Sequence, residues 1–294
     1  MRRAEIPPCY NANGNEEPSC SHIMINAVDN LNKYSSFIES FYEDLDFSDP
    51  HLNEMRDANE DISGWIKKPD HYCFVSQDGE KTLGLFVFII YESERYIEML
   101  VGLSKDADAI EEMLVFLEGN YPGYHTDFVF NPRWSLFMEA LRKRGAHFDI
   151  EQQRMVYTHR KVSVNTGGAI PYSEKYRDQY IEMHDKDLYW VAEKVIEAKD
   201  RFNIFLAVEN DIVVGYLDVT HCFEENEPYS FFVKPEYRRQ GIGRKLLCKA
   251  LQENEPKEMM LFVDVDNIPA IRLYESLGFI KKENANTQTA NLKL

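Results

Sequence analysis

The sequence lacks features that would assign it to a membrane, secreted or metal-binding class. No apolar run approaches the ~18 residues that a membrane-spanning helix needs, and residues 1–21 contain no apolar segment typical of a secretory signal. The five cysteines are odd in number and follow no metal-ligand spacing. We therefore expect a cytoplasmic protein with no membrane partner and no metal.

Positive charge is also scarce. Against 50 aspartates and glutamates stand 33 lysines and arginines, so the formal net charge is −17. Because nucleic-acid binding needs positive surface that neutralises phosphates, we expect no nucleic-acid partner. An acidic surface can steer cationic substrates such as amines, although it also serves solubility. Apolar residues make up 44% of the chain, which favours packed cores over disorder.

The one basic cluster lies in residues 231–244, where a strand, a glycine-rich turn and a helix follow one another. Phe231, Phe232 and Val233 favour the strand, and Pro235 ends it because proline cannot donate to a sheet ladder. Glycines in the turn let main-chain N–H groups at the helix start point at one anion. The turn therefore predicts a pyrophosphate site formed by Arg238, Arg239, Gln240, Gly241, Ile242, Gly243 and Arg244.

Two common nucleotide-binding loops do not fit this turn. A P-loop needs Lys-Ser/Thr after its last glycine, where this chain has Arg244 and Lys245. A dinucleotide-binding loop needs a third glycine near position 246, which is Leu246. The pattern Arg-x-x-Gly-x-Gly after a strand ending in Val-x-Pro instead resembles the acyl-CoA pyrophosphate loop of the GNAT superfamily of N-acyltransferases. A glycine-rich turn with solvated arginines is the plain structural alternative.

A second segment carries the same resemblance. Residues 259–265 read as a buried strand, after which Asn267 caps a helix that Gly278 ends. The string from Asn267 to Phe279 is similar to the GNAT pattern Asn-x-x-Ala-x-x-x-Tyr-x-x-x-Gly-Phe at every fixed position, with Tyr274 as its tyrosine. Two motifs in the expected order identify residues 161–294 as a GNAT acetyltransferase domain.

The resemblance implies a site for acetyl-CoA, the cosubstrate, between the strand at 231–233 and the strand at 260–265. Main-chain groups of that first strand, from Phe231 to Val233, would pair with pantetheine, and N–H groups from the turn would bind pyrophosphate. Asn267 would contact the cofactor, in addition to capping its helix. Tyr274 would give a proton to the departing thiolate, although a core position on an amphipathic helix would also explain it.

The sequence alone does not identify the general base. Some members of the superfamily use a glutamate on the strand before the capping asparagine, where this chain has Phe262. Strand alternation can direct Asp264 and Asp266 away from the site. An amine with a lowered pKa needs no dedicated base. The remaining candidates lie on the preceding hairpin: Asp218, His221, Glu224, Glu225 and Glu227.

The first half of the chain repeats the pattern of the second. We expect a flexible tail at 1–22, a degenerate GNAT-like domain at 23–160 and the acetyltransferase domain at 161–294. The hairpin at 74–88 matches that at 205–219, and Met138 stands where the second copy has Tyr274. Residues 104–110 contain two aspartates and no glycine, so the first copy is predicted to be structural. The expected fold class is mixed α/β, with two GNAT-like domains, each a mainly antiparallel mixed sheet flanked by helices.

The sequence thus predicts an N-acyltransferase that moves an acyl group, with acetyl favoured, from CoA to a primary amine. The acceptor is left open between small molecules and peptide amines, and the oligomeric state between monomer and homodimer. A non-catalytic acyl-CoA-binding or regulatory protein is the alternative. A small-amine-binding module with no CoA affinity is a third interpretation.

Overall fold

The computed structural model describes residues 23–42, 44–50, 52, 58–159, 166–186 and 188–294, and the chain divides into two compact units. The first unit comprises Met1–Glu151 and Asn284–Leu294, and the second comprises Gln152–Glu283. The expected flexible tail, residues 1–22, lies outside the described residues. No helix in the described part of the chain is long and apolar enough to cross a membrane.

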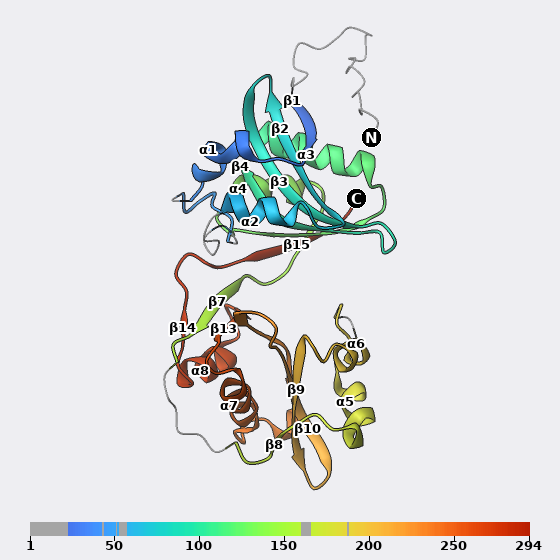
Figure 1. The fold of residues 1–294 in the computed structure, drawn as a ribbon, viewed down its shortest axis with the longest axis vertical. Coiled ribbons are helices and arrows are strands. Elements are labelled where there is room, and N and C mark those ends of the chain that lie inside the picture. The colour runs from blue at the N-terminus through green and yellow to red at the C-terminus, as the bar shows by residue number, and fades with distance from the viewer. Residues whose placement is uncertain (1–22, 43, 51, 53–57, 160–165, 187) are drawn as a thin grey trace. The chain divides into compact units, whose positions relative to one another are not determined.

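One seven-stranded sheet forms the first unit (Figure 1), in the order β1 (Ile23–Val28), β2 (His71–Asp78), β3 (Lys81–Tyr91), β4 (Tyr96–Ser104), β5 (His125–Phe130), β15 (Gln288–Lys293) and β6 (His147–Phe148). Neighbouring strands are antiparallel except β4 and β5. Alternate residues of β2 and β3 enter two cores, one on each face. Helices α3 (Ala107–Asn120) and α4 (Ser135–Lys143) cover one face, and α1 (Ser35–Glu39) and α2 (Ala58–Trp65) the other.

The strands of the second unit form two four-stranded sheets. The first has the order β12 (Pro228–Val233), β10 (Ile212–Thr220), β9 (Phe202–Glu209) and β8 (Ala169–Pro171). The second has the order β11 (Glu225–Asn226), β13 (Glu258–Asp264), β7 (Gln152–Tyr157) and β14 (Phe279–Lys281). Helices α7 (Ile242–Asn254) and α8 (Ile268–Ser276) lie on one side of β9 and β10, and α5 (Arg177–Met183) and α6 (Ala192–Glu197) on the other (Figure 1).

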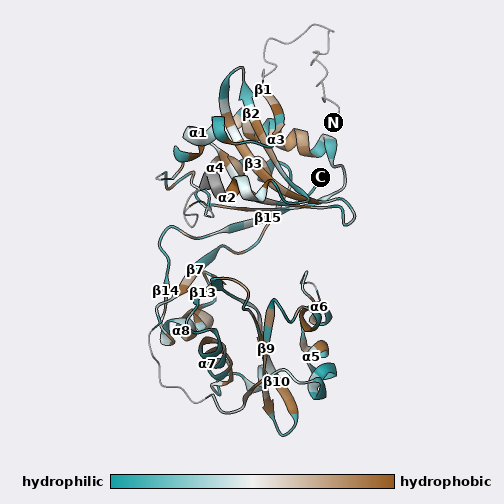
Figure 2. Cartoon of the chain, in the orientation of Figure 1, coloured by the Kyte–Doolittle hydropathy of each residue, from teal (hydrophilic) through white to brown (hydrophobic). Residues whose placement is uncertain are grey.

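Side-chain alternation explains how these strands serve two faces. Along β13 the buried positions are Met259, Leu261 and Val263, which enter the core beneath α7 and α8. On β10, Val214 and Leu217 enter that same core, whereas Val213 and Tyr216 pack beneath α5 and α6. Figure 2 shows the hydrophobic residues along β9 and β10 and the mixed faces of α5 and α6. The face of β9 and β10 that α5 and α6 cover thus packs into a second apolar core.

Two strands are exchanged between the units. Strand β7 precedes the boundary expected at 160/161, but it pairs with β13 and β14 of the second unit. Strand β15 follows the whole second unit, but it pairs with β5 and β6 of the first. The structural boundary therefore lies at Glu151/Gln152 with a return at Glu283/Asn284, which differs from the single boundary drawn from sequence.

A buried polar network fixes α5 to β10 in the second unit. The Tyr180 hydroxyl and the His184 Nε2 each lie 2.9 Å from the Asp218 carboxylate, and these three side chains are almost fully buried. The His184 ring also stacks on Tyr216, whose hydroxyl lies 2.9 Å from the Ser230 hydroxyl on β12. Burial raises the pKa of Asp218, although hydrogen bonds from His184 and Tyr180 oppose it. Asp218 is therefore a structural residue.

We expect Asp218→Asn to destabilise the second unit by about 3–5 kcal/mol, because it removes the buried negative charge and leaves a single oxygen to accept from both His184 and Tyr180. Thermal unfolding followed by circular dichroism measures the loss. Asp211→Asn is the matched control. The Asp211 carboxylate also contacts residues just before α5, namely Lys175 and Tyr176, but it lies at the solvent-exposed turn of the hairpin. Equal melting temperatures for the two variants would contradict the buried role.

Candidate functional site

The glycine-rich turn links edge strand β12 to helix α7 through a 3₁₀ turn at Pro235–Tyr237. Arg239 and Gly241 have φ angles of 65° and 79°, so the backbone is left-handed at both positions. Gly241 is the N-cap of α7 and offers no side chain to accept from the helix. The first N–H groups of α7 therefore have no side-chain acceptor and can donate to an anion.

Gly243 is needed for packing rather than for its backbone angle. A Cβ at this position would lie 3.1 Å from the Phe231 ring, which is tighter than most Cβ contacts, and 3.5 Å from Leu273, which is an ordinary contact. A Cβ at Gly241 would meet nothing within 4 Å, so only its positive φ demands glycine. The two glycines of the motif thus have different physical reasons.

The arginines of the turn keep their charge free for a ligand. Arg238 donates from Nε to the Val233 carbonyl at 2.9 Å and lies 5.7 Å from the Phe232 ring. Arg244 donates to the Ser276 hydroxyl at 2.6 Å. Arg238, Arg239 and Arg244 form no ion pair with any described residue. Their uncompensated charge lies beside the uncapped start of α7.

Strand β12 has an open edge on the side away from β10. It is the last strand of its sheet, and β13 belongs to the other sheet of the unit. Only the two residues of β11 pair with the start of β13, at Glu258 and Met259. On that side the main chain of Phe231–Val233 has no strand partner among the described residues, although the Val233 carbonyl accepts from Arg238 Nε.

Asn267 and Tyr274 lie on the helix that follows β13. The Asn267 side chain accepts from the Ala270 N–H at 3.3 Å, so it caps α8 as its position predicts. The Tyr274 ring is 8% exposed and packs against Phe279 with ring centroids 5.8 Å apart. Burial raises the pKa of Tyr274 to about 12, so its hydroxyl stays protonated at physiological pH.

The structure separates the five candidate bases left open by the sequence. Asp218 is held in the buried network, and Glu225 forms an ion pair with Arg154. His221 lies against the Lys199 carbonyl. Glu224 is exposed, which leaves Glu227 as the partly buried carboxylate of the set.

Glu227 immediately precedes β12. Its main-chain N–H donates to Thr220, while its carboxylate makes no hydrogen bond within the described part of the chain. Burial raises the pKa of Glu227, and the positive charges of Arg201 and Arg154 offset this only in part. A carboxylate in this environment binds a proton more readily than an exposed one.

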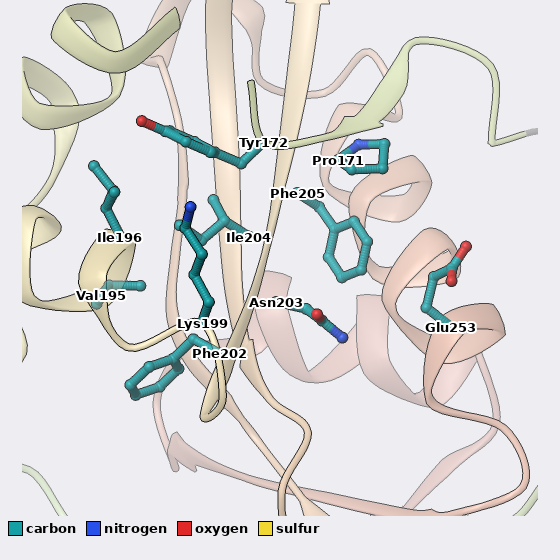
Figure 3. Close-up of a pocket in the computed structure, with 10 residues that line it drawn as sticks. All are labelled: Pro171, Tyr172, Val195, Ile196, Lys199, Phe202, Asn203, Ile204, Phe205 and Glu253. Atoms are coloured by element: carbon teal, nitrogen blue, oxygen red, sulfur yellow. The ribbon is translucent and has the colours of Figure 1, made fainter. Parts of the chain in front are cut away.

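A cavity of about 390 Å³ lies elsewhere in the second unit, beside β9 (Figure 3). Val195 and Ile196 of α6 line it together with Lys199 and residues of β9, and Glu253 of α7 contributes from another side. None of its lining residues belongs to the turn or to α8. Among the described residues, no group of histidine, cysteine, aspartate or glutamate is arranged to hold a metal ion.

The first unit has a different structure at the position of the turn. Strand β4 ends at Ser104, and Asp106 caps α3 by accepting from the Ala109 N–H at 2.9 Å. A carboxylate of the chain therefore takes the place that an anionic ligand would need at the helix start. Met138, the counterpart of Tyr274, lies in α4 and has no proton to donate.

Comparisons with known proteins agree with this geometry. Residues 200–281 match the acetyltransferase (GNAT) domain family. The [ribosomal protein bS18]-alanine N-acetyltransferase of Escherichia coli K12 is 29% identical over 121 residues, which cover 40% of this chain and 81% of that protein. The L-amino acid N-acyltransferase MnaT of the same strain is 25% identical over 113 residues, which cover 36% of this chain and 63% of that protein.

Two solved structures show that the fold likeness extends over both units. A GCN5-related N-acetyltransferase from Sphaerobacter thermophilus has a TM-score of 0.62 at 12% identity, covering 92% of this chain and 96% of that one. A tandem GNAT protein from the clavulanic acid biosynthesis pathway has a TM-score of 0.50 at 13% identity, covering 92% and 98%. Residues 200–281 therefore carry an acetyltransferase (GNAT) domain, and the fold of the chain is like that of solved GNAT proteins, one of them a tandem GNAT protein.

Proposed function

We propose that the second unit transfers an acetyl group from acetyl-CoA to a primary amine. The observation that carries this proposal is the uncapped, positively charged start of α7 at the end of an open edge strand. The turn supplies N–H donors and unpaired arginine charge for pyrophosphate. The free edge of β12 supplies main-chain groups for the amide-bearing pantetheine arm.

In this proposal the chemistry occurs near the start of β12, within reach of Glu227 and at the end opposite to the turn. The amine nitrogen attacks the thioester carbon, and a main-chain N–H at the open edge stabilises the oxyanion. The C–N bond forms as the C–S bond breaks, and CoA leaves as a thiolate that acquires a proton. The protein must then accept a proton from the amine and stabilise the thiolate.

Tyr274 is proposed to stabilise the thiolate. Its pKa of about 12 lies above that of an ordinary thiol, near ~8.5, so complete proton transfer to the thiolate is unfavourable. A buried phenol that keeps its proton is nevertheless a good hydrogen-bond donor to a developing anion. Tyr274 therefore acts chiefly as a donor, and solvent completes the protonation.

Glu227 is proposed to accept the proton of the amine. Its raised pKa brings the carboxyl closer to the operating pH, which improves a general base. It precedes β12, so it lies at the end opposite to the pyrophosphate turn. An acceptor entering from that end meets Glu227 before it reaches the thioester.

We expect one acetyl-CoA site per chain in a calorimetric titration. Gly241→Val should abolish binding because a β-branched side chain cannot hold the left-handed backbone that presents the N–H donors. Gly168→Val is the matched control, since Gly168 also has a positive φ and open space around it. Absence of binding to the wild-type chain would refute the proposal, and two sites would show that the first unit also binds.

We expect Tyr274→Phe to lower kcat about 10- to 100-fold, the low end of the range for positioned proton donors. The KM for acetyl-CoA should not change, because the lost interaction forms only as the thiolate develops. Tyr172→Phe is the control, because it removes a phenol hydroxyl at another place in the unit, just after β8. An unaltered kcat would assign Tyr274 to core packing alone.

We expect kcat/KM to fall as the pH drops through the raised pKa of Glu227, because only the ionised carboxylate accepts a proton. The midpoint should lie above 4.5, the ordinary value for glutamate. Glu227→Gln should lower kcat/KM about 100-fold or more and remove this acidic limb. Glu224→Gln, which changes an exposed neighbour, should leave the pH profile intact. A profile that Glu227→Gln does not alter excludes Glu227 as the base.

A further inference from the structure

Arg201 lies in the turn between α6 and β9 and is surrounded by aromatic rings. Its guanidinium carbon lies 5.0 Å from the Trp190 ring centroid, 5.2 Å from Phe223 and 5.6 Å from Phe202. Cation–π contacts of this kind hold a cation in place without neutralising it. The three rings come from the segment before α6, the loop after β10 and the start of β9, so they fix Arg201 from separate elements.

The Arg201 guanidinium makes no hydrogen bond or ion pair within the described part of the chain, although its charge acts on the Glu227 carboxylate. Its Nε is buried and unbonded, and no hydrogen bond or ion pair involves its side chain. Acidic residues outnumber basic ones 50 to 33, so carboxylates to pair with it are abundant in this sequence. A buried donor left unpaired is costly and uncommon, which points to an acceptor supplied from outside.

The surroundings of Arg201 belong to the acceptor side of the proposed site. Its charge acts on Glu227 and on Tyr229, the residues on either side of the first residue of β12. The Tyr229 hydroxyl also accepts from the Trp190 N–H at 3.2 Å, which ties the aromatic ring set to β12. From Glu227 to Val233 the strand spans ~20 Å at ~3.3 Å per residue. Arg201 therefore lies far from the pyrophosphate turn.

We propose that Arg201 binds the carboxylate of an acceptor whose amine lies at Glu227, so that the acceptor is an amino acid or an amine with a carboxylate a few bonds away. This rests on the proposed acetyltransferase function. The planar guanidinium presents two parallel N–H donors that match a carboxylate. A free amino acid and a peptide with an acidic residue at its N-terminus share this chemistry.

Charge complementarity favours such an acceptor over a simple amine or a simple anion. A plain polyamine would place positive charge beside the unpaired Arg201, which is unfavourable. A plain carboxylate would be repelled at long range by the net charge of −17 and would have no group for Glu227. A zwitterion has no net charge, and its two ends match Arg201 and Glu227.

The test uses the full-length protein and a CoA-release assay with acceptors matched in pairs. The pairs are standard amino acids with their primary amides, and short peptides starting with Asp or Glu with the same peptides starting with Asn or Gln. The wild-type protein should show a KM at least about tenfold lower for the carboxylate member of one pair, as expected for a charge-assisted hydrogen-bonded contact. The amino-acid and peptide pairs distinguish the two sources.

Arg201→Gln should raise the KM for the preferred carboxylate about 10- to 100-fold and leave that for its amide and the affinity for acetyl-CoA unchanged. Arg201→Lys keeps the charge but loses the two parallel donors, so its KM for the preferred carboxylate should lie between those of the wild type and Arg201→Gln. Lys199→Gln is the matched control, because it removes a cation two residues away whose side chain is exposed. A melting temperature equal to that of the wild type confirms that each variant folds.

Two outcomes would overturn the inference. One is equal use, or equal lack of use, of both members of every pair by the wild-type protein. The other is a loss in Arg201→Gln that affects carboxylate and amide equally, which would make Arg201 a support for its aromatic neighbours. Calorimetric binding of the amino acids without acetyl-CoA gives a separate readout. Failure of the acetyltransferase function shows as absent acetyl-CoA binding, so the two failures are distinguishable.

Discussion

The separation of β12 from β13 is the constraint on which the second unit depends. If these strands were paired, the main chain of Phe231–Val233 would be satisfied within the sheet and closed to any ligand. Because they belong to different sheets, β12 keeps an edge with no strand partner among the described residues. The turn and α7 begin where this edge ends, so one short stretch of chain holds both an edge strand and a helix start without a side-chain cap.

The elements that carry the motifs could be predicted from sequence because their determinants are local. Proline ends the strand before the turn, and glycine with positive φ begins α7, as the pattern at Pro235 and Gly241 indicates. Asn210 and Asp211 both have positive φ at the predicted hairpin turn between β9 and β10. The cap at Asn267 follows from its place before a proline-containing first turn. Each of these signals acts within a few residues.

The features that sequence could not supply depend on neighbours distant in the chain. From sequence, Glu227 was one of five equal candidates for the general base. The structure separates them, because Asp218 is buried in a network and Glu225 is paired with Arg154. Arg201 gave no signal at all, since its aromatic neighbours come from three separate segments. The pKa of Tyr274 is higher than a residue-level argument allows, because the packing around α8 sets it. The hydrophobic periodicity of a strand likewise does not indicate which strands pair with it.

Strands β7 and β15 each lie on the opposite side of the domain boundary expected from sequence to the sheet that they join. A fragment cut at the apparent domain boundary would leave β13 and β14 without the strand that lies between them, and the first sheet without β15. Such exposed edges favour aggregation. A second unit expressed alone must therefore run from Gln152 to Glu283, because that continuous segment keeps β7 and excludes β15.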